Sequence, residues 1–318
     1  MDIPRSIRED LESRKNVIGT AIGPKRVGDR PTDEEALVVL VSEKLPETHL
    51  AEVDRIPSEI EFDDTRIRTD VQEVGDVRTQ ATTAQPAEEP DRERRWRPAP
   101  AGVSLGHPEI TAGTLGSPPL QTEDGKTVVL TNAHVAAPID TAQPGDNILQ
   151  PGPADGGSDD DVIGTLVEGS EIRPNEPNTT DSAIVEVDPE QFTGTVLGIG
   201  EFAGFTEVSA DATFTKSGRT TGVTTGDLRG RDARIKVRGY HDEPTVFEGI
   251  DVFGPMSAAG DSGSLIGIDG DDGFRATDLL FAGSDRTTLA IPMDAVEEEH
   301  GALAPAGSES GAEDASKQ

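Results

Sequence analysis

Short apolar segments separated by turn-forming residues dominate the chain from residue 101 to residue 302. ITAGTLG, KTVVLTNAHV, DVIGTLVEG, DSAIVEV, ARIKVRGY and SGSLIGI are runs of this kind. Runs rich in Val, Ile and Thr between turn clusters are typical of an antiparallel barrel or sandwich. IDGDDGF has the Asp-Gly signature of a hairpin turn, and MDAVEEEHGAL predicts a short capping helix. The pattern therefore predicts a mainly β fold.

Residues 1–75 have a different pattern and predict a small α+β unit. A polar helix around residues 6–15 precedes the apolar stretch NVIGTAIG and the strand-like EALVVLVSEKL. EIEFDDTRIRTDVQEV predicts two strands around an Asp-Asp turn. About seventy residues is within the size range of an independent domain. Its role stays open between a prosegment, a substrate-recruiting module and an oligomerisation element, and the oligomeric state is undetermined.

Two further segments lack an apolar period. Residues 76–100 are rich in Pro, Ala, Thr and charge, which predicts a linker or a strap laid over a surface. Trp96, the single tryptophan, either anchors that strap or is a partly exposed aromatic. Residues 303–318 are small and polar, which predicts a disordered tail.

The net charge and the lack of long apolar runs limit the binding partners and the cellular location that we expect. With 28 basic and 61 acidic residues the net charge is −33, so nucleic acid and anionic membranes are repelled and neither is expected as a partner. No apolar run approaches the roughly 18 residues that cross a bilayer, and the N-terminus has no apolar signal core, which favours a cytoplasmic location. The acidic surface resembles that of haloarchaeal proteins, so we expect a salt-adapted protein that loses structure in dilute buffer.

Candidate chemistry begins with SAAGDSGSLIG, which places Ser262 between glycines and behind an aspartate. A serine hydroxyl needs a base to take its proton, and that base needs an acceptor to orient it. His134 follows the apolar strand of TVVLTNAHVA, and Asp181 precedes the apolar strand of NTTDSAIVEVD. The sequence therefore supplies His134, Asp181 and Ser262 beside three predicted strands.

Other candidates for chemistry are weaker. Acidic runs such as DGGSDDD do not match the twelve-residue EF-hand spacing, and the chain contains no cysteine. We therefore expect no metal and no cofactor. Ser264, one strand period further on, is a rival nucleophile, but it lacks the preceding glycine pair and is expected to be structural.

TNAHV, DSAIVEV and GDSGS, in the order His, Asp, Ser, resemble the trypsin/chymotrypsin-like serine peptidases over residues 101–302. The resemblance implies a chymotrypsin-like double β-barrel in which His134 is the general base, Asp181 orients it and Ser262 attacks the scissile carbonyl. It also implies an oxyanion hole from the N–H groups of Gly260 and Ser262, worth a few kcal/mol to the transition state.

The same resemblance suggests where substrate binds. Phe281, Ala282, Gly283 and Ser284 would form the edge strand that pairs with substrate backbone. Met256 would lie near the base of the specificity pocket, and since it is uncharged a small or apolar preference is expected. No trypsin-like activation site is found between residues 77 and 105, so Asp261 needs another partner, an arginine being one option.

The sequence thus predicts a metal-independent serine endopeptidase acting on peptides or proteins. Two alternatives stay open: a peptide-binding protein on a protease fold with little turnover, and a protein that cuts only itself near residues 76–100. Fold alone does not choose among them.

Overall fold

The computed structural model describes residues 1–318 except 2, 29, 63–64, 80–90, 210–211 and 308–318. Strands dominate the described residues, with short helices α1 (Arg5–Glu12), α2 (Ala133–Ala136) and α3 (Met293–His300). The mainly β prediction is confirmed. No helix in the described part of the chain is both long enough and apolar enough to cross a membrane.

One sheet carries the first two candidate residues. Its order is β11-β12-β13-β10-β9-β23, with pairing antiparallel throughout. The strands are β9 (Leu120–Thr122), β10 (Thr127–Thr131), β11 (Asn147–Leu149), β12 (Val162–Gly169), β13 (Ala183–Val187) and β23 (Leu303–Pro305). Val129, Leu166 and Val185 are among the apolar residues buried against it.

A second, larger sheet carries the third candidate. Its order is β17-β16-β20-β21-β22-β19-β18-β1-β2-β4-β3. From β16 onward in the chain its strands are β16 (Phe214–Gly218), β17 (Gly222–Gly226), β18 (Leu228–Val237), β19 (Thr245–Phe253), β20 (Leu265–Gly270), β21 (Gly273–Gly283) and β22 (Thr288–Pro292). The Asp-Gly hairpin expected in IDGDDGF is the β20–β21 turn, where Gly270 pairs with Gly273.

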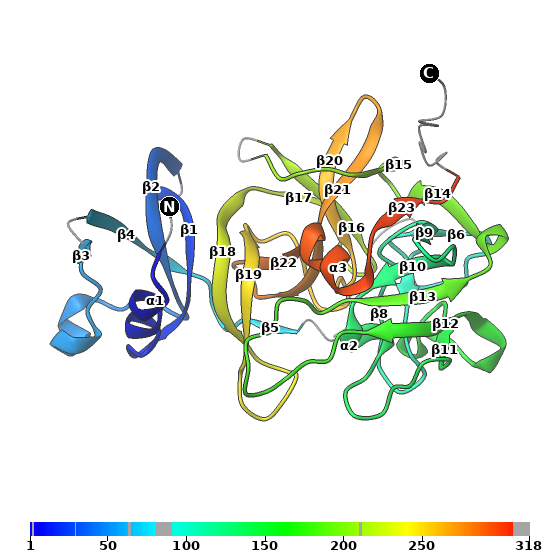
Figure 1. Cartoon of the computed structure of the whole chain (residues 1–318), viewed down its shortest axis with the longest axis horizontal. Coiled ribbons are helices and arrows are strands. Elements are labelled where there is room, and N and C mark those ends of the chain that lie inside the picture. The colour runs from blue at the N-terminus through cyan, green and yellow to red at the C-terminus, as the bar shows by residue number, and fades with distance from the viewer. Residues whose placement is uncertain (2, 29, 63–64, 80–90, 210–211, 308–318) are drawn as a thin grey trace, which may run out of the picture.

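The strands of the N-terminal unit belong to the larger sheet and do not form a separate one. The unit consists of α1, β1 (Val17–Val27), β2 (Arg30–Val41), β3 (Glu59–Phe62) and β4 (Thr65–Glu73), with 3-10 turns at Glu47–His49 and Glu52–Asp54. β1 pairs antiparallel with β18, Gly19 opposite Ile235 and Thr20 opposite Arg234. Arg8 of α1 also bonds Asp232 on β18. Figure 1 shows this unit at one end of the molecule, beyond β18, with the β10–β13 sheet at the other end.

The remaining shorter strands are β5 (Arg78–Thr79), β6 (Ala99–Ala101), β7 (Ser104–Leu105), β8 (Gly113–Thr114), β14 (Phe192–Val196) and β15 (Gly200–Phe205), with 3-10 turns at Pro153–Asp155, Asp159–Asp161 and Pro189–Gln191. Of these strands, β5, β6, β14 and β15 belong to the larger sheet, and β7 and β8 pair with each other in a separate two-stranded sheet. Trp96 lies partly buried and packs against the core beneath β10 and β13.

The disordered tail predicted for residues 303–318 was placed to begin too early in the sequence. Leu303 pairs with Thr122 and Pro305 with Leu120, so residues 303–305 form the edge strand β23 of the first sheet. The rest of the predicted tail, from residue 308, lies outside the described residues. Leu303 is buried in the core. Burial of this apolar side chain favours strand pairing of the segment, although the neighbouring sequence is small and polar.

Candidate active site

Neighbouring strands bring His134 and Asp181 together. β10 pairs with β13 so that Thr131 lies opposite Ala183. His134 lies in α2, just after β10, and Asp181 lies just before β13. His134 Nδ1 lies 2.5 Å from Asp181 Oδ2, and the His134 backbone N–H donates to Asp181 Oδ1 at 3.1 Å. The carboxylate therefore holds the imidazole with Nδ1 protonated and leaves Nε2 to accept a proton.

Asp181 is fully buried and is held by further donors. The Tyr240 hydroxyl donates to Asp181 Oδ2, and the side-chain amide of Asn132 donates to the Asp181 backbone carbonyl at 2.7 Å. Tyr240 also packs edge-on against the imidazole of His134, with ring centroids 5.9 Å apart. Burial and the negative charge of Asp181 raise the pKa of Tyr240 well above its ordinary value, so the phenol stays protonated and remains a donor.

Ser262 lies in the loop between β19 and β20. Its side chain is buried, and its Oγ donates to the Phe281 carbonyl oxygen at 3.2 Å. Within the described residues, His134 Nε2 has no hydrogen-bond partner. The Ser262 hydroxyl would have to leave the Phe281 carbonyl before it could donate to Nε2.

The loop before Ser262 is shaped to present backbone N–H groups. Gly260 has φ +98°, a left-handed conformation that favours glycine. Its carbonyl accepts from Thr114 Oγ1 at 2.8 Å, and the Ser262 carbonyl accepts from the Thr114 N–H at 2.8 Å. In the part of the chain that the structure describes, the N–H groups of Gly260 and Ser262 donate no hydrogen bond, which leaves both for a ligand oxygen.

The partner that Asp261 was expected to need is a lysine and not an arginine, the one option named from the sequence. The Asp261 carboxylate accepts from Lys216 Nζ at 3.2 Å, with both side chains fully buried. It also accepts from the N–H groups of Ala258 and Thr220 at 2.9 Å each, and from the N–H and hydroxyl of Thr221 at 3.0 and 2.6 Å. This internal ion pair fixes the loop that carries Ser262. The nearby guanidinium of Arg219 instead pairs with Asp155 and Glu93.

Two sets of contacts connect the His134 and Ser262 regions. A Cβ built on Gly113 would meet the side chain of Val135 and, at 3.0 Å, the Ser262 carbonyl oxygen, so this glycine lies between the two loops. A row of aromatic rings continues from Tyr240 to Phe247 and on to Phe281, with centroids 5.2 and 4.8 Å apart. The three candidates therefore share one junction between the two sheets.

The predicted substrate-binding residues lie in two settings. Met256 is buried and packs with Phe214, Phe253 and Leu280. Phe281 and Ala282 are also buried, and Ala282 and Gly283 end β21. Ser284 begins the turn after β21, and its hydroxyl donates to the Val74 carbonyl at 2.5 Å. The Phe281–Gly283 stretch thus lies at Ser262, and Ser284 lies against the N-terminal unit.

The remaining sequence candidates have structural partners. Ser264 is fully buried, and its hydroxyl donates to the Asp261 carbonyl at 2.6 Å. Among the described residues, no group of three or more His, Cys, Asp or Glu side chains is arranged to hold a metal ion.

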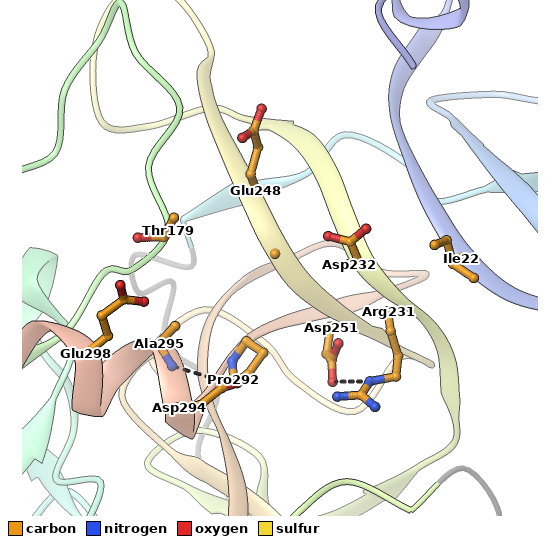
Figure 2. Close-up of a pocket in the computed structure, with 11 residues that line it drawn as sticks. Ile22, Thr179, Arg231, Asp232, Glu248, Asp251, Pro292, Asp294, Ala295 and Glu298 are labelled. Carbon is orange, nitrogen blue, oxygen red and sulfur yellow. Dashed lines mark hydrogen bonds and ion pairs between the residues drawn. The ribbon is translucent and has the colours of Figure 1, made fainter. Parts of the chain in front are cut away.

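A cavity of about 520 Å³ lies elsewhere, between β18, β19 and α3. Figure 2 shows Asp232, Glu248, Asp251 and Glu298 around it, with Arg231 paired to Asp251. None of His134, Asp181 and Ser262 lines this cavity.

Sequence reasoning missed Tyr240 and Lys216. Tyr240 is 59 residues from Asp181 and lies in ARIKVRGY, a segment predicted only to be a strand. Lys216 lies in TKSGRTTG, a predicted strand and turn. Nothing in the local sequence of that strand predicts that the lysine side chain points into the core. The one available signal was that Asp261, next to the nucleophile, needed a cationic partner.

No protein-family model matches the sequence, and no curated protein matches it. Solved structures to which the chain is similar include Thermobifida fusca protease A, at 16% identity over 64% of this chain and 96% of that one, with a TM-score of 0.47. Cellulomonas bogoriensis chymotrypsin is 18% identical over 65% and 97% of the two chains, with a TM-score of 0.46. Nocardiopsis protease is 16% identical over 64% and 97%, with a TM-score of 0.47.

Proposed function

We propose that this chain is a serine endopeptidase that hydrolyses peptide bonds in peptides or proteins. The observation that carries the proposal is the His134–Asp181 pair, with Nδ1 2.5 Å from a buried carboxylate at the same junction as Ser262. His134 takes the proton of the Ser262 hydroxyl through Nε2, and Ser262 forms an acyl-enzyme that water then hydrolyses. The N–H groups of Gly260 and Ser262 stabilise the negative oxygen that forms.

The internal Lys216–Asp261 pair supports a loop that is assembled as the chain folds. Five donors around the Asp261 carboxylate fix the turn between Gly260 and Ser262. Burial lowers the pKa of Lys216, and the charge of Asp261 opposes that shift. The proposal therefore needs no cleavage to create the oxyanion site.

A second candidate function is peptide binding with little turnover. It is favoured by the Ser262 hydroxyl, which donates to the Phe281 carbonyl and not to His134. A protein of this kind would hold a peptide beside β21 without attacking it.

A fluorophosphonate probe separates the two functions. We expect labelling of the wild-type chain in high salt, mapped by mass spectrometry to Ser262, and its loss in Ser262→Ala and His134→Ala. Ser264→Ala is the matched control and should label normally. Well-folded protein that is never labelled, but binds peptide, would favour the binding function.

A further inference from the structure

The backbone edge of β21 beside Ser262 is already occupied by this chain. Along that edge, Gly263 donates to the Leu280 carbonyl and Leu280 donates to the Ser264 carbonyl, both at 2.9 Å. The next residue, Phe281, accepts from Ser262 Oγ. Beyond it, Ala282 pairs with Thr79 and Gly283 with Arg78, the two residues of β5.

The opposite edge of β21 offers no alternative. There Ala282 pairs with Leu289 and Gly283 with Thr288, both on β22. A peptide that adds as a strand next to Ser262 must therefore use the edge that β5 holds.

The direction of β5 leads to the nucleophile. The pairing is antiparallel, so moving from Arg78 to Thr79 corresponds to moving from Gly283 to Ala282. One further step along β21 reaches Phe281, whose carbonyl contacts Ser262. The segment that contains β5 thus approaches the site along its backbone edge and not across it.

β5 is anchored on its other side as well. The Thr79 N–H donates to the Arg238 carbonyl at 2.9 Å, and the Arg238 N–H donates to the Val77 carbonyl at 3.1 Å. Gly239 has φ +111°, and a side chain there would collide with Thr79 Oγ1. Val74 and Val77 are each only 2% exposed and belong to the core of the larger sheet. The segment is therefore built into the fold and does not merely touch it.

We propose that residues 74–79 are an intramolecular occupant of the peptide-binding edge of β21. This inference rests on the proposed function for its consequence: a substrate in trans must displace β5 before its backbone can pair beside Ser262. The occupied fraction then lowers the apparent affinity for any peptide that binds as a strand. A small probe that needs only Ser262, His134 and the oxyanion site is unaffected.

A reversible cross-link tests the inference, because the natural chain has no cysteine. Arg78 and Arg238 form a parallel bridge pair, within the reach of a disulfide between adjacent strands. In Arg78→Cys/Arg238→Cys, oxidation should lock β5 and lower peptide hydrolysis by at least about tenfold relative to the same protein after reduction. Fluorophosphonate labelling of Ser262 should be equal in both states.

Loosening the segment should have the opposite effect. Val77→Ala removes core contacts, and Thr79→Pro removes the N–H that donates to Arg238. Both should raise peptide hydrolysis, whereas Val53→Ala, at a 73% exposed position, should not. Equal hydrolysis in the locked and reduced proteins, with no gain in either loosened variant, would overturn the inference.

A binding measurement keeps this test separate from the proposed function. In the Ser262→Ala background, a fluorescein-labelled peptide EVGDVRT, the sequence of residues 73–79, should bind after Val77→Ala or Thr79→Pro but not to the locked protein. Absent labelling and hydrolysis in every variant would reject the peptidase alone, since this binding pattern does not need turnover. Binding that is indifferent to the lock and to loosening would reject the occupant alone.

Discussion

Two carboxylates in the larger sheet region are both fully buried, yet their surroundings are opposite. Asp261, in the loop that carries Ser262, accepts from Lys216, two backbone N–H groups of the turn at Thr220 and Thr221, the Thr221 hydroxyl and the Ala258 N–H. Asp278, on β21, has no hydrogen-bond partner on either carboxylate oxygen within the described residues. The larger sheet region therefore contains one buried carboxyl group that is surrounded by donors and one that has none within the described residues.

The difference shows what each region can tolerate. A buried carboxylate is stable as an ion only when donors replace water, and otherwise it retains its proton. Burial, and then the negative charge of Asp251, raise the pKa of Asp278 well above its ordinary value. Asp251 lines the cavity of Figure 2 beside Arg231, and burial raises its pKa to about 6. The loop that carries Ser262 is thus held by an ion pair, whereas burial in the β19–β21 region raises the pKa of both carboxyl groups.

Removing the cation from the first region should have the largest effect. Lys216→Met leaves the Asp261 charge buried without its counter-ion, a change that typically costs about 3–5 kcal/mol. We expect that loss in the free energy of unfolding, measured by urea titration at constant salt, together with loss of Ser262 labelling. Adding Asp261→Asn should recover part of the stability. A single variant as stable as wild type would show that the backbone donors alone hold Asp261.

Removing the ionisable group from the second region should stabilise the protein at high pH. At pH 8 the carboxyl of Asp278 ionises in the unfolded chain, whereas its raised pKa in the folded state favours the proton. Asp278→Asn keeps the size of the side chain but cannot ionise, so we expect a gain of about 1.4 kcal/mol for each pH unit by which folding raises this pKa, counted up to pH 8. At pH 4 the wild-type group is protonated, and the gain should vanish. Urea titrations at both pH values decide this, and a gain of equal size at pH 4 would point to packing instead of charge.

The free energy of unfolding of the wild-type chain should depend on pH in the direction that the raised pKa of Asp251 dictates. Its pKa is raised in the folded state, so the folded state binds more protons than the unfolded state between about pH 4 and pH 6. The resulting stability is fully present below that window and is lost as the pH rises through 6, by at most about 1.4 kcal/mol per pH unit. Asp251→Asn should flatten this part of the profile. A profile unchanged by the substitution would assign the slope to other groups.

The smallest expected effect concerns a third buried carboxylate, Asp181, and its hydrogen bond from Tyr240. Tyr240→Phe removes one donor from Asp181, which concentrates its charge on His134. If the chain is a peptidase, we expect kcat/KM to fall about tenfold, equivalent to about 1.4 kcal/mol, and the acid limb of its pH profile to move to higher pH. The free energy of unfolding controls for a structural effect. A loss of activity without movement of the acid limb would make Tyr240 a packing residue only.

The local pattern of the sequence was sufficient for much of the fold. Short apolar runs between turn clusters predicted β10, β13 and the β20–β21 hairpin, because a buried strand is apolar over its length and the Asp-Gly turn is a short-range signal. The same reading predicted helices near α1 and α3. It also selected His134, Asp181 and Ser262, and the structure brings the first two into contact and the third to the same junction.

The tertiary structure alone decided which segments meet. β1 joins β18 across more than 200 residues, β23 closes the first sheet, and β5 occupies the edge of β21. Lys216 and Tyr240 became visible only once the strands were paired. The hydrogen bonds between strands join backbone groups, so they depend little on which side chains the strands carry. A buried ion pair joins two residues far apart in the chain, so local sequence does not predict it. Local apolar runs therefore predicted the strands, the motifs and their resemblance to a known family selected the candidate residues, and long-range packing determined their partners.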